Sequence, residues 1–396
     1  MKKVLLLNYY FPGSGVSFRV HYFAKCLCRA GYKVDLVYSS KKPWDLWIHT
    51  KKIDDNLTVI TFPSVIRRDS PFSYLLRTLV GIYWTLFKKY DFIHAFGVGL
   101  PSSSIPAIFA RRFKKGTKIF VDWDDAFGEG YGEVFGFFSH AVIRFLENKT
   151  PIWARPDAFT VVSRHFKVRL LKMGVSVDKI NIIPNGADTK LIKPIPMDEA
   201  RKTVGWNAGD EIILSMGHNY FGSLETLMET FSIVSGKRPD VKLKMLGRPM
   251  RVGRFAEVFD GILKRFYHLK EKIEWMGEAP REEVGPYLCA ADCLLLPMEN
   301  SVMDEARAPI RIGDYLASGR PVVSNAVGYT RDVFSKAMPN GVCRDPDDRE
   351  EFADKILEVL EDPELADEMG KAGLELAEGE YNWEKICERL ENVYRL

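Results

Sequence analysis

The chain has 396 residues, 46% of them hydrophobic and 28% charged, a balance that suits a globular protein of two domains. Its six cysteines form no C-x-x-C pair, which argues against a zinc site and a disulfide framework and fits a reducing cytosol. The first apolar run is too short before Pro12 for a signal peptide, so we expect a cytoplasmic protein.

The net charge of +3 conceals two halves of opposite sign. Residues 1–190 carry 29 basic and 15 acidic side chains, a net charge of +14, whereas the remainder carries 27 and 38, a net charge of −11. A basic half favours an anionic partner, either the inner face of a membrane or nucleic acid. Because neither zinc-finger spacing nor an RNP-type aromatic strand is present, we predict an anionic membrane surface as the partner and no nucleic acid.

The first 40 residues predict a strand, a glycine-containing loop, a helix and a second strand. These elements are expected at residues 3–7, 8–16, 17–30 and 33–38. Ser17 would cap the helix and Gly31 would end it, while Gly13 and Gly15 would let backbone N–H groups approach a phosphate or sugar. The G-x-G pattern lacks the third glycine of a dinucleotide fingerprint and Asp35 lies in mid-strand, so NAD binding is the weaker alternative.

Residues 71–87 form the most apolar stretch of the chain, with Arg67-Arg68 before it and Lys88-Lys89 after it. The stretch is shorter than the roughly 20 residues that span a bilayer, and Arg77 interrupts it. Two interpretations remain open. The helix either packs on a parallel sheet or lies in the membrane interface, where residues 111–118 and 134–145 would extend the same basic, aromatic face.

Two predicted strands end in residues of the types that occur in catalytic and metal-binding sites. His94 belongs to D-F-I-H-A-F and is placed at the carboxyl edge of a sheet, where open α/β sheets bind ligands, although a lone histidine is more often structural. The next strand ends in D-W-D-D. Asp124 and Asp125 are the favoured catalytic pair; the alternatives are a metal-binding pair of Asp122 and Asp124, as in single-domain GT-A enzymes, and solvated loop acids.

The C-terminal half repeats the strand–helix rhythm, which predicts a second Rossmann-like sheet. We place the border in the proline-containing segment after N-I-I-P-N-G-A-D, which gives domains at residues 1–193 and 194–382. Residues 383–396 are predicted as a final amphipathic helix.

The segment E-A-R-A-P-I-R-I-G-D-Y-L-A-S-G-R-P-V-V, residues 305–323, predicts a short helix followed by a buried strand. Pro309 suits the first helical position, and Gly319 suits a left-handed stop. Arg311 and Asp314 then share one face, where a cation suits phosphate and a carboxylate suits a sugar diol. A surface ion pair is the alternative.

This last segment resembles the donor-binding signature of the retaining glycosyltransferase family 4, of GT-B fold, and residues 181–188 and 381–394 resemble two further segments of that family. The resemblance implies two Rossmann-like parallel-sheet domains facing a central cleft, with the last helix crossing back onto the first domain. It implies that Asp314 holds the ribose of a nucleotide sugar and that Arg311 lies near its diphosphate. It further implies no cofactor and no metal.

The chain departs from the family pattern at three positions, where Ala306, His218 and Ser223 replace an acid and two basic residues. Glu305 is the acid next to the first of these, and Arg311, Arg248 and Arg331 are candidate replacements for the lost positive charge. The backbone N–H groups of residues 327–330, at an expected helix start, would share that role. The complete set of expected donor-binding residues is Gly13, Gly15, His218, Arg248, Glu305, Arg311, Asp314, Gly328, Tyr329 and Thr330, and the expected catalytic set is His94, Asp124, Asp125 and Arg311.

We therefore predict an α/β glycosyltransferase that moves a sugar from a nucleotide sugar to a hydroxyl of a glycan or lipid-linked acceptor, in the cytoplasm or at the inner face of the membrane. The alternatives are a non-catalytic sugar-nucleotide-binding protein and an NAD-dependent oxidoreductase. The identities of the sugar, the base and the acceptor are left open at this point.

Overall fold

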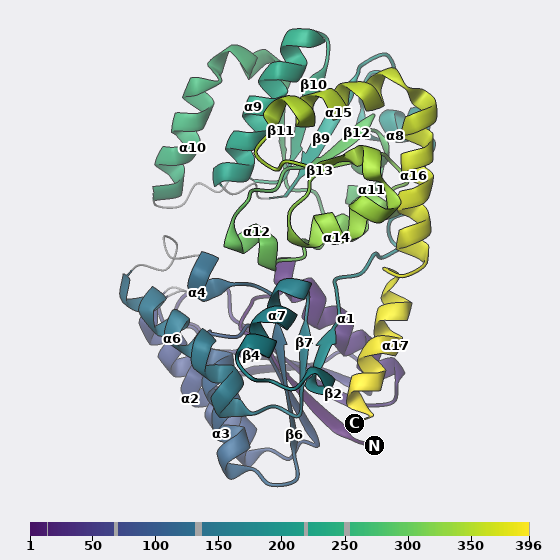
Figure 1. The fold of residues 1–396 in the computed structure, drawn as a ribbon. Coiled ribbons are helices and arrows are strands. Elements are labelled where there is room, and N and C mark those ends of the chain that lie inside the picture. Colours follow the sequence, from purple (N-terminus) through teal and green to yellow (C-terminus); the bar gives the residue numbers. More distant parts are fainter. Residues whose placement is uncertain (14, 67–69, 131–136, 218–220, 249–253, 396) are drawn as a thin grey trace. The chain divides into compact units, whose positions relative to one another are not determined.

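A computed structural model describes residues 1–396 except 14, 67–69, 131–136, 218–220, 249–253 and 396. The chain divides into two compact units, each built on a sheet with helices packed against it (Figure 1). The first unit comprises Met1–Asn185, Glu305–Ala308 and Trp383–Leu396, and the second comprises Gly186–Asp304 and Pro309–Asn382. The division falls after Asn185 rather than after residue 193, because the backbone N–H of Ala187 bonds the carbonyl of Tyr381, 2.7 Å away in the second unit.

In the described residues, the first unit holds an eight-stranded sheet in the order β3-β4-β2-β1-β5-β6-β7-β8, parallel except for β3. Its strands are β1 Lys3–Leu7, β2 Lys33–Ser39, β3 His49–Lys52, β4 Leu57–Phe62, β5 Phe92–Phe96, β6 Lys118–Trp123, β7 Ala158–Val161 and β8 Ile180–Ile182. Leu5 and Leu7 pack in one hydrophobic cluster, and Val4 and Leu6 pack in another. The central strand β1 is therefore buried on both faces, which is typical of a parallel sheet.

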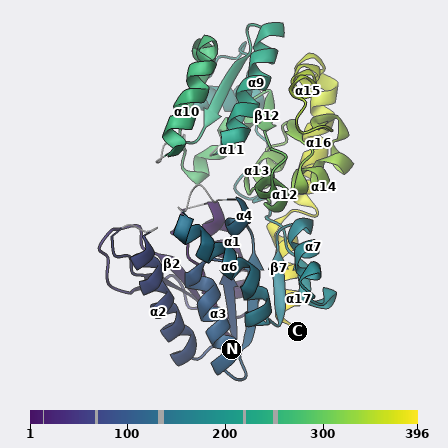
Figure 2. The same ribbon diagram turned by 60° about the vertical axis from the view of Figure 1, so that its left-hand side comes forward.

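Helices cover both faces of this sheet (Figures 1 and 2). One face carries α1 and α17, and the other carries a row of α2, α3 and α6. The helices of this unit are α1 Gly15–Arg29, α2 Pro71–Phe87, α3 Pro101–Phe113, α4 Phe127–Gly130, α6 Phe137–Ala154, α7 Arg164–Lys172 and α17 Trp383–Tyr394. The predicted helix at residues 71–87 is confirmed. The predicted cap is wrong, since α1 begins at Gly15 and Ser17 is buried in its first turn.

A disulfide joins the two helices that share a face of the first sheet. Cys26 in α1 and Cys387 in α17 are bonded, with Cα atoms 5.1 Å apart and 361 residues of sequence separation. The prediction of no disulfide is wrong here. The spacing of cysteines in a sequence cannot reveal two buried positions that only the packing of a terminal helix brings together.

The second unit holds, in its described residues, a six-stranded parallel sheet in the order β11-β10-β9-β12-β13-β14. Its strands are β9 Ile212–Met216, β10 Lys242–Leu246, β11 Ile273–Gly277, β12 Cys293–Leu296, β13 Val322–Asn325 and β14 Val342–Cys343. Its helices are α8 Met197–Val204, α9 Phe221–Lys237, α10 Arg254–Arg265, α11 Val284–Cys289, α13 Arg311–Ala317, α14 Gly328–Ala337, α15 Arg349–Glu361 and α16 Pro363–Glu378. A further helix, α12 Val302–Ala306, contributes residues to both units.

The predicted helix and strand between residues 305 and 323 are confirmed as α13 and β13. The helix is shorter than expected, because it begins two residues after Pro309. Gly319 follows it with a φ of 68°, the left-handed conformation that glycine adopts without steric cost.

Candidate functional site

Three glycines gather at the carboxyl edge of the second sheet, where open α/β sheets bind ligands. Gly217, Gly247 and Gly277 end β9, β10 and β11, and all have positive φ. A Cβ at Gly247 would lie 3.0 Å from the carbonyl oxygen of Gly217. The N–H of Gly217 donates to Leu246, and that of Gly247 donates to Gly277, both at 2.7 Å. At these three positions the edge therefore presents backbone without a side chain.

The guanidinium of Arg311 lies across this glycine edge. Its Nη1 donates to the carbonyl of Met216 at 2.6 Å and would lie 3.0 Å from a Cβ at Gly217. One turn later, the hydroxyl of Tyr315 accepts from the N–H of Met216 at 2.7 Å and donates to Leu295 at 3.2 Å. Two side chains of α13 thus attach the helix to the ends of β9 and β12, and they place a cation beside bare backbone.

Asp314 is buried and forms an ion pair with a partly exposed residue that the sequence did not single out. Its two carboxylate oxygens accept from Nη1 and Nη2 of Arg281, each at 2.5 Å. Burial raises the pKa of Asp314, and the Arg281 guanidinium opposes that shift. The alternative of a surface pair with Arg311 is wrong, because Arg311 turns to the strand ends instead. A bidentate pair occupies two of about four lone-pair positions of a carboxylate, which leaves capacity for ligand hydroxyls.

The other predicted donor residues fall into three groups. Arg248 follows Gly247 at the glycine edge, is exposed and lies 3.2 Å from Glu278. Gly328 begins α14 with a φ of 47°, and Tyr329 next to it is buried. The backbone N–H of Thr330, expected to approach the diphosphate, donates to the carbonyl of Val327 at 3.0 Å, and its buried side chain bonds Asn325 and Val327 as part of the helix cap. His218 lies outside the described residues.

In the first unit, Gly13 lies in the loop after β1 with a φ of 84°, whereas Gly15 is the first residue of α1. Asp35, on which an NAD site would depend, is occupied within the protein. Its carboxylate accepts from the Tyr90 hydroxyl at 2.6 Å and lies 2.8 Å from the ammonium of Lys3. Asp35 is therefore not available to bind the ribose of NAD, which argues against the oxidoreductase alternative.

His94 is a core histidine, and its predicted catalytic role is corrected. The residue lies inside β5 with no exposed surface, two residues before the strand ends. Its Nδ1 lies 2.9 Å from the Tyr394 hydroxyl, and its Nε2 lies 3.0 Å from Oγ1 of Thr160. Burial lowers the pKa of His94 to about 4, so the ring is neutral near pH 7.

The carboxylate of Asp122 is also bonded within the protein. Both of its oxygens accept from Arg19 in α1, at 3.0 and 2.7 Å, and Thr160 donates to one of them. Arg19 and Asp122 are both buried, and Arg19 further bonds Asn185 at 3.3 Å. A metal pair of Asp122 and Asp124 would have to break this ion pair, so the GT-A alternative is not supported.

Asp124 and Asp125 follow β6 at the carboxyl edge of the first sheet. Both are 8% exposed, and neither carboxylate oxygen of Asp124 has a hydrogen-bond partner among the described residues. Burial raises the pKa of Asp124 well above its usual value, and the charges of Asp122 and Asp125 add to that shift. A buried carboxyl group without a partner is unusual in a folded protein, which makes Asp124 a candidate for a ligand contact.

Glu305 groups with the first unit, not with the glycine edge. The adjoining carbonyls are bonded there, that of Ala306 by the Ser163 hydroxyl at 2.5 Å and that of Ala308 by the Asn185 amide at 2.7 Å. On α7, burial lowers the pKa of His165, and the charge of Glu305 opposes that shift.

The loop that carries Asp124 is supported by a buried glutamate. Glu147 in α6 accepts from the N–H of Gly128 and from Arg169, both at 3.2 Å. Burial raises the pKa of Glu147 from 4.5 to about 7, although Arg169 opposes the shift. Because the folded state then binds the proton more tightly than the unfolded state, the free energy of unfolding should fall as the pH rises from about 4.5 to about 7.

We expect Glu147→Gln to remove this decrease, which is on the order of 3 kcal/mol for a single fully shifted group. Urea unfolding at pH 5 and pH 7.5 measures it. The control Glu388→Gln changes an exposed glutamate of α17 and should retain the wild-type difference. An equal pH dependence in all three proteins would remove Glu147 as its source.

Two parallel-sheet units of this kind, with a cation at the carboxyl edge of the second, define the GT-B class. Residues 13–191 match the family described as Glycosyltransferase Family 4, and residues 196–376 match Glycosyl transferases group 1. The chain belongs to the family 4-like glycosyltransferases of GT-B fold.

Related proteins and solved structures agree with this assignment. The chain is 24% identical over 60% of its length to a GDP-mannose-dependent phosphatidylinositol monomannoside mannosyltransferase of Corynebacterium glutamicum, and 22% identical over 55% to a D-inositol 3-phosphate glycosyltransferase of Thermobispora bispora. These alignments span 61% and 50% of the two relatives. One component of the phosphatidylinositol N-acetylglucosaminyltransferase of Arabidopsis thaliana is 23% identical over all of this chain and 81% of its own.

Two solved structures share the fold over the whole chain. Sucrose-phosphate synthase from Thermosynechococcus elongatus has a TM-score of 0.80 at 20% identity and is covered over 98% of its length. Anabaena Alr3699/HepE in complex with UDP and glucose has a TM-score of 0.73 at 15% identity and is covered completely.

Proposed function

We propose that the protein transfers a sugar from a nucleotide-sugar donor to a hydroxyl of a lipid-linked acceptor, with retention of anomeric configuration and without a metal ion. The position of Arg311 across the glycine edge of the second sheet is the observation that carries the proposal. The relatives named for phosphatidylinositol and inositol phosphate acceptors support a phosphorylated or lipid-linked acceptor.

The chemistry requires positive charge where the diphosphate leaves. Departure of a nucleoside diphosphate builds negative charge on the phosphates, and preorganised donors stabilise that charge best in the transition state. Arg311 supplies a fixed cation, and Arg248 adds a second at the same edge. Asp314 would hold the ribose hydroxyls with the lone pairs that Arg281 leaves. On the acceptor side, Asp124 carries a raised pKa that favours its protonated form, which can both donate to and accept from a hydroxyl.

A thermal-shift panel of UDP-glucose, GDP-mannose and UDP-N-acetylglucosamine tests the donor. A ligand present at 100 times its Kd should stabilise the native state by about 2.7 kcal/mol. Release of nucleoside diphosphate that depends on an acceptor, with the product anomer assigned by NMR, then separates a transferase from a non-catalytic binding protein. Activity that is lost with a chelator would contradict the metal-free proposal.

A membrane surface is the second partner we propose, because α2 is apolar on its outer side. Its buried residues are polar or small: Ser73, Arg77, Thr78, Gly81 and Thr85. Its outward residues are large and apolar, between 52% and 71% exposed, and recur at helical spacing: Phe72, Leu75, Leu79, Tyr83 and Phe87. None of the helices in the described part of the chain combines the length and apolar character needed to cross a bilayer. With Lys88 and Lys89 at its end, α2 suits the interface of an anionic membrane.

Co-sedimentation with vesicles tests this surface. We expect the protein to bind phosphatidylcholine vesicles that contain 30% phosphatidylglycerol at low salt, and Leu75→Gln with Leu79→Gln to weaken binding at least tenfold. The control Val168→Gln with Leu171→Gln alters two exposed residues of α7 and should bind as the wild type does. Failure of the wild type to sediment would exclude the membrane.

A further inference from the structure

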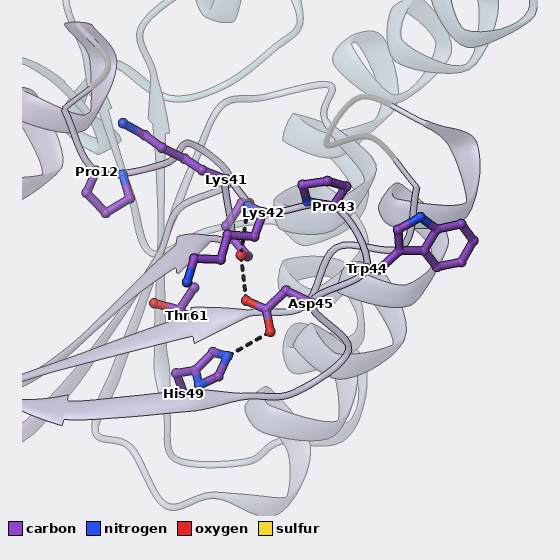
Figure 3. Close-up of a pocket in the computed structure, with 10 residues that line it drawn as sticks. Pro12, Lys41, Lys42, Pro43, Trp44, Asp45, His49 and Thr61 are labelled. Atoms are coloured by element: carbon purple, nitrogen blue, oxygen red, sulfur yellow. Dashed lines mark hydrogen bonds and ion pairs between the residues drawn. The ribbon is translucent and has the colours of Figure 1, made fainter.

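A hollow of about 610 Å³ lies in the first unit, where β2 and β4 end (Figure 3). The end of β2 and the loop after it form most of its wall, and Pro12, His49 of β3 and Thr61 of β4 complete it. None of the predicted site residues lines it. The hollow is therefore a second candidate site on the carboxyl side of this sheet. The side chains that line it indicate which kind of ligand it could bind.

The hollow carries positive charge. Asp45, the acid in its wall, is already satisfied: its carboxylate accepts from the Ser40 hydroxyl at 2.6 Å and lies 2.7 Å from Nε2 of His49. These hydrogen bonds lower the pKa of Asp45, so it stays ionised and holds His49 in place. The ammonium groups of Lys41 and Lys42 are then the remaining charges of the wall. Figure 3 shows the two ammonium groups pointing apart, that of Lys42 toward Thr61 and that of Lys41 away from it, where it also lies 4.5 Å from the centroid of the Phe11 ring. Both side chains are exposed, so the wall offers an anion of phosphate size two cations on flexible stems.

Trp44 adds an exposed aromatic side chain to the hollow, and its backbone has a sterically unfavourable conformation. Its φ is 59°, a conformation that bulky residues rarely adopt, and its side chain is 64% exposed. Two backbone bonds maintain the conformation, from Trp44 to the carbonyl of Val65 at 2.5 Å and from Ser64 to the carbonyl of Asp45 at 2.7 Å. The indole projects outward beside Pro43 (Figure 3). Strain of this kind concentrates at functional sites.

The hollow is joined to the apolar helix α2. Nη1 of Arg77 donates to the Ser39 hydroxyl at 2.8 Å, and the N–H of Val65 donates to the Ser73 hydroxyl at 2.9 Å. Ser39 lines the hollow, and Val65 holds Trp44. Both bonds come from the buried, polar side of α2, so they fix the wall of the hollow to the helix whose opposite side is apolar and exposed.

We propose that this hollow binds the phosphate of a phosphorylated polyol, the head of the acceptor. The inference rests on the proposed function, which requires an acceptor in this unit. Lys41 and Lys42 bind the phosphate, and Trp44 and Pro43 contact the polyol ring. The same chemistry is found in a free polyol phosphate and in a phospholipid headgroup, and the position of α2 favours the lipid.

Isothermal titration with inositol 3-phosphate tests the site in the full chain. We expect binding to the wild type, at least tenfold weaker binding to Lys41→Ala with Lys42→Ala, and no binding of unphosphorylated inositol. The matched control Lys51→Ala with Lys52→Ala removes the same charge from exposed positions of β3 outside the hollow, and should bind within twofold of the wild type. Equal binding by both double variants, or no binding by the wild type, would overturn the proposal.

Trp44→Gly separates a binding role from a structural one. Glycine adopts a positive φ freely, so this variant should keep or raise Tm by a few degrees while it weakens inositol 3-phosphate binding several-fold. A lower Tm with unchanged binding would assign Trp44 to the fold alone and remove it from the site.

Vesicles distinguish the two sources of the phosphate. If free inositol 3-phosphate displaces the protein from phosphatidylcholine vesicles that contain phosphatidylinositol, the hollow binds the lipid head. If the free ligand binds and these vesicles do not compete, it binds the free polyol phosphate. The nucleotide-sugar thermal shift should be equal in wild type and in both lysine variants. If no nucleotide sugar raises the Tm of the wild type, the transferase proposal is refuted, whatever the result for the phosphate site.

Discussion

Replacement of Arg311 by alanine is expected to lower kcat by about 10²- to 10³-fold, the cost of removing one preorganised donor to a developing negative charge. The fold should lose about 1.5–3 kcal/mol, the usual worth of a charged hydrogen bond such as the one from Arg311 to the carbonyl of Met216. Initial rates at saturating nucleotide sugar, together with urea unfolding, measure both effects. Arg311→Lys should recover part of the rate, since it keeps the charge but not the planar fork.

Arg265→Ala is the matched control for this experiment. Arg265 lies at the end of α10, pairs with Glu225 and Glu229 and is about half exposed, so its loss should leave kcat within twofold of the wild type. If Arg311→Ala turned over as fast as this control, the leaving-group role would have to be withdrawn. If only stability fell, Arg311 would be assigned to anchoring α13.

Loss of the Cys26–Cys387 bond is expected to lower the free energy of unfolding of the first unit by about 5 kcal/mol, since it closes a very long loop. For a unit of this size the change corresponds to a decrease in Tm of about 10 °C. Cys387→Ser should show the decrease without reductant and none with it, because reduction brings the wild type to the same state. Scanning calorimetry in the presence and absence of reductant measures the difference.

Cys28→Ser is the control, because Cys28 lies in the same helix two residues from Cys26 and is not disulfide-bonded. It should melt as the wild type does. A thiol titration of the unfolded chain without reductant should find four of the six cysteines reactive. Six reactive thiols, or equal melting of all three proteins, would show that the bond does not form.

Local signals explain why part of the donor site could be predicted. The position of Gly319 follows from helix-stop chemistry, and the three-residue spacing placed Arg311 and Asp314 on one short helix. The partners of these residues could not be predicted in the same way. Arg281 is 33 residues from Asp314, and Met216 is 95 residues from Arg311, so no local pattern connects them.

The acidic cluster after β6 is a second case in which a local sequence pattern indicated a site but not the partners of its residues. Three aspartates at a strand end indicated a site, and the sequence favoured Asp124 and Asp125, but it could not show the partner of each carboxylate. Those partners depend on α1, where Arg19, 103 residues away, pairs with Asp122, whereas Asp124 has no partner among the described residues. The burial of His94 in the core could not be predicted for a related reason, because its partner Tyr394 lies 300 residues away in the sequence.

The alternation of strands and helices in each half and the helix of Arg311 could be predicted from the sequence alone, since propensity, caps and hydrophobic periodicity act over a few residues. The strands β3 and β4 at one edge of the first sheet, of which β3 is antiparallel, were not predicted. Which ionisable groups pair with each other was decided only by the tertiary structure, as were the bond between Cys26 and Cys387 and the hollow beside Trp44. Burial and hydrogen bonding depend on distances in space, and residues far apart in the chain come together only when the sheets and helices pack.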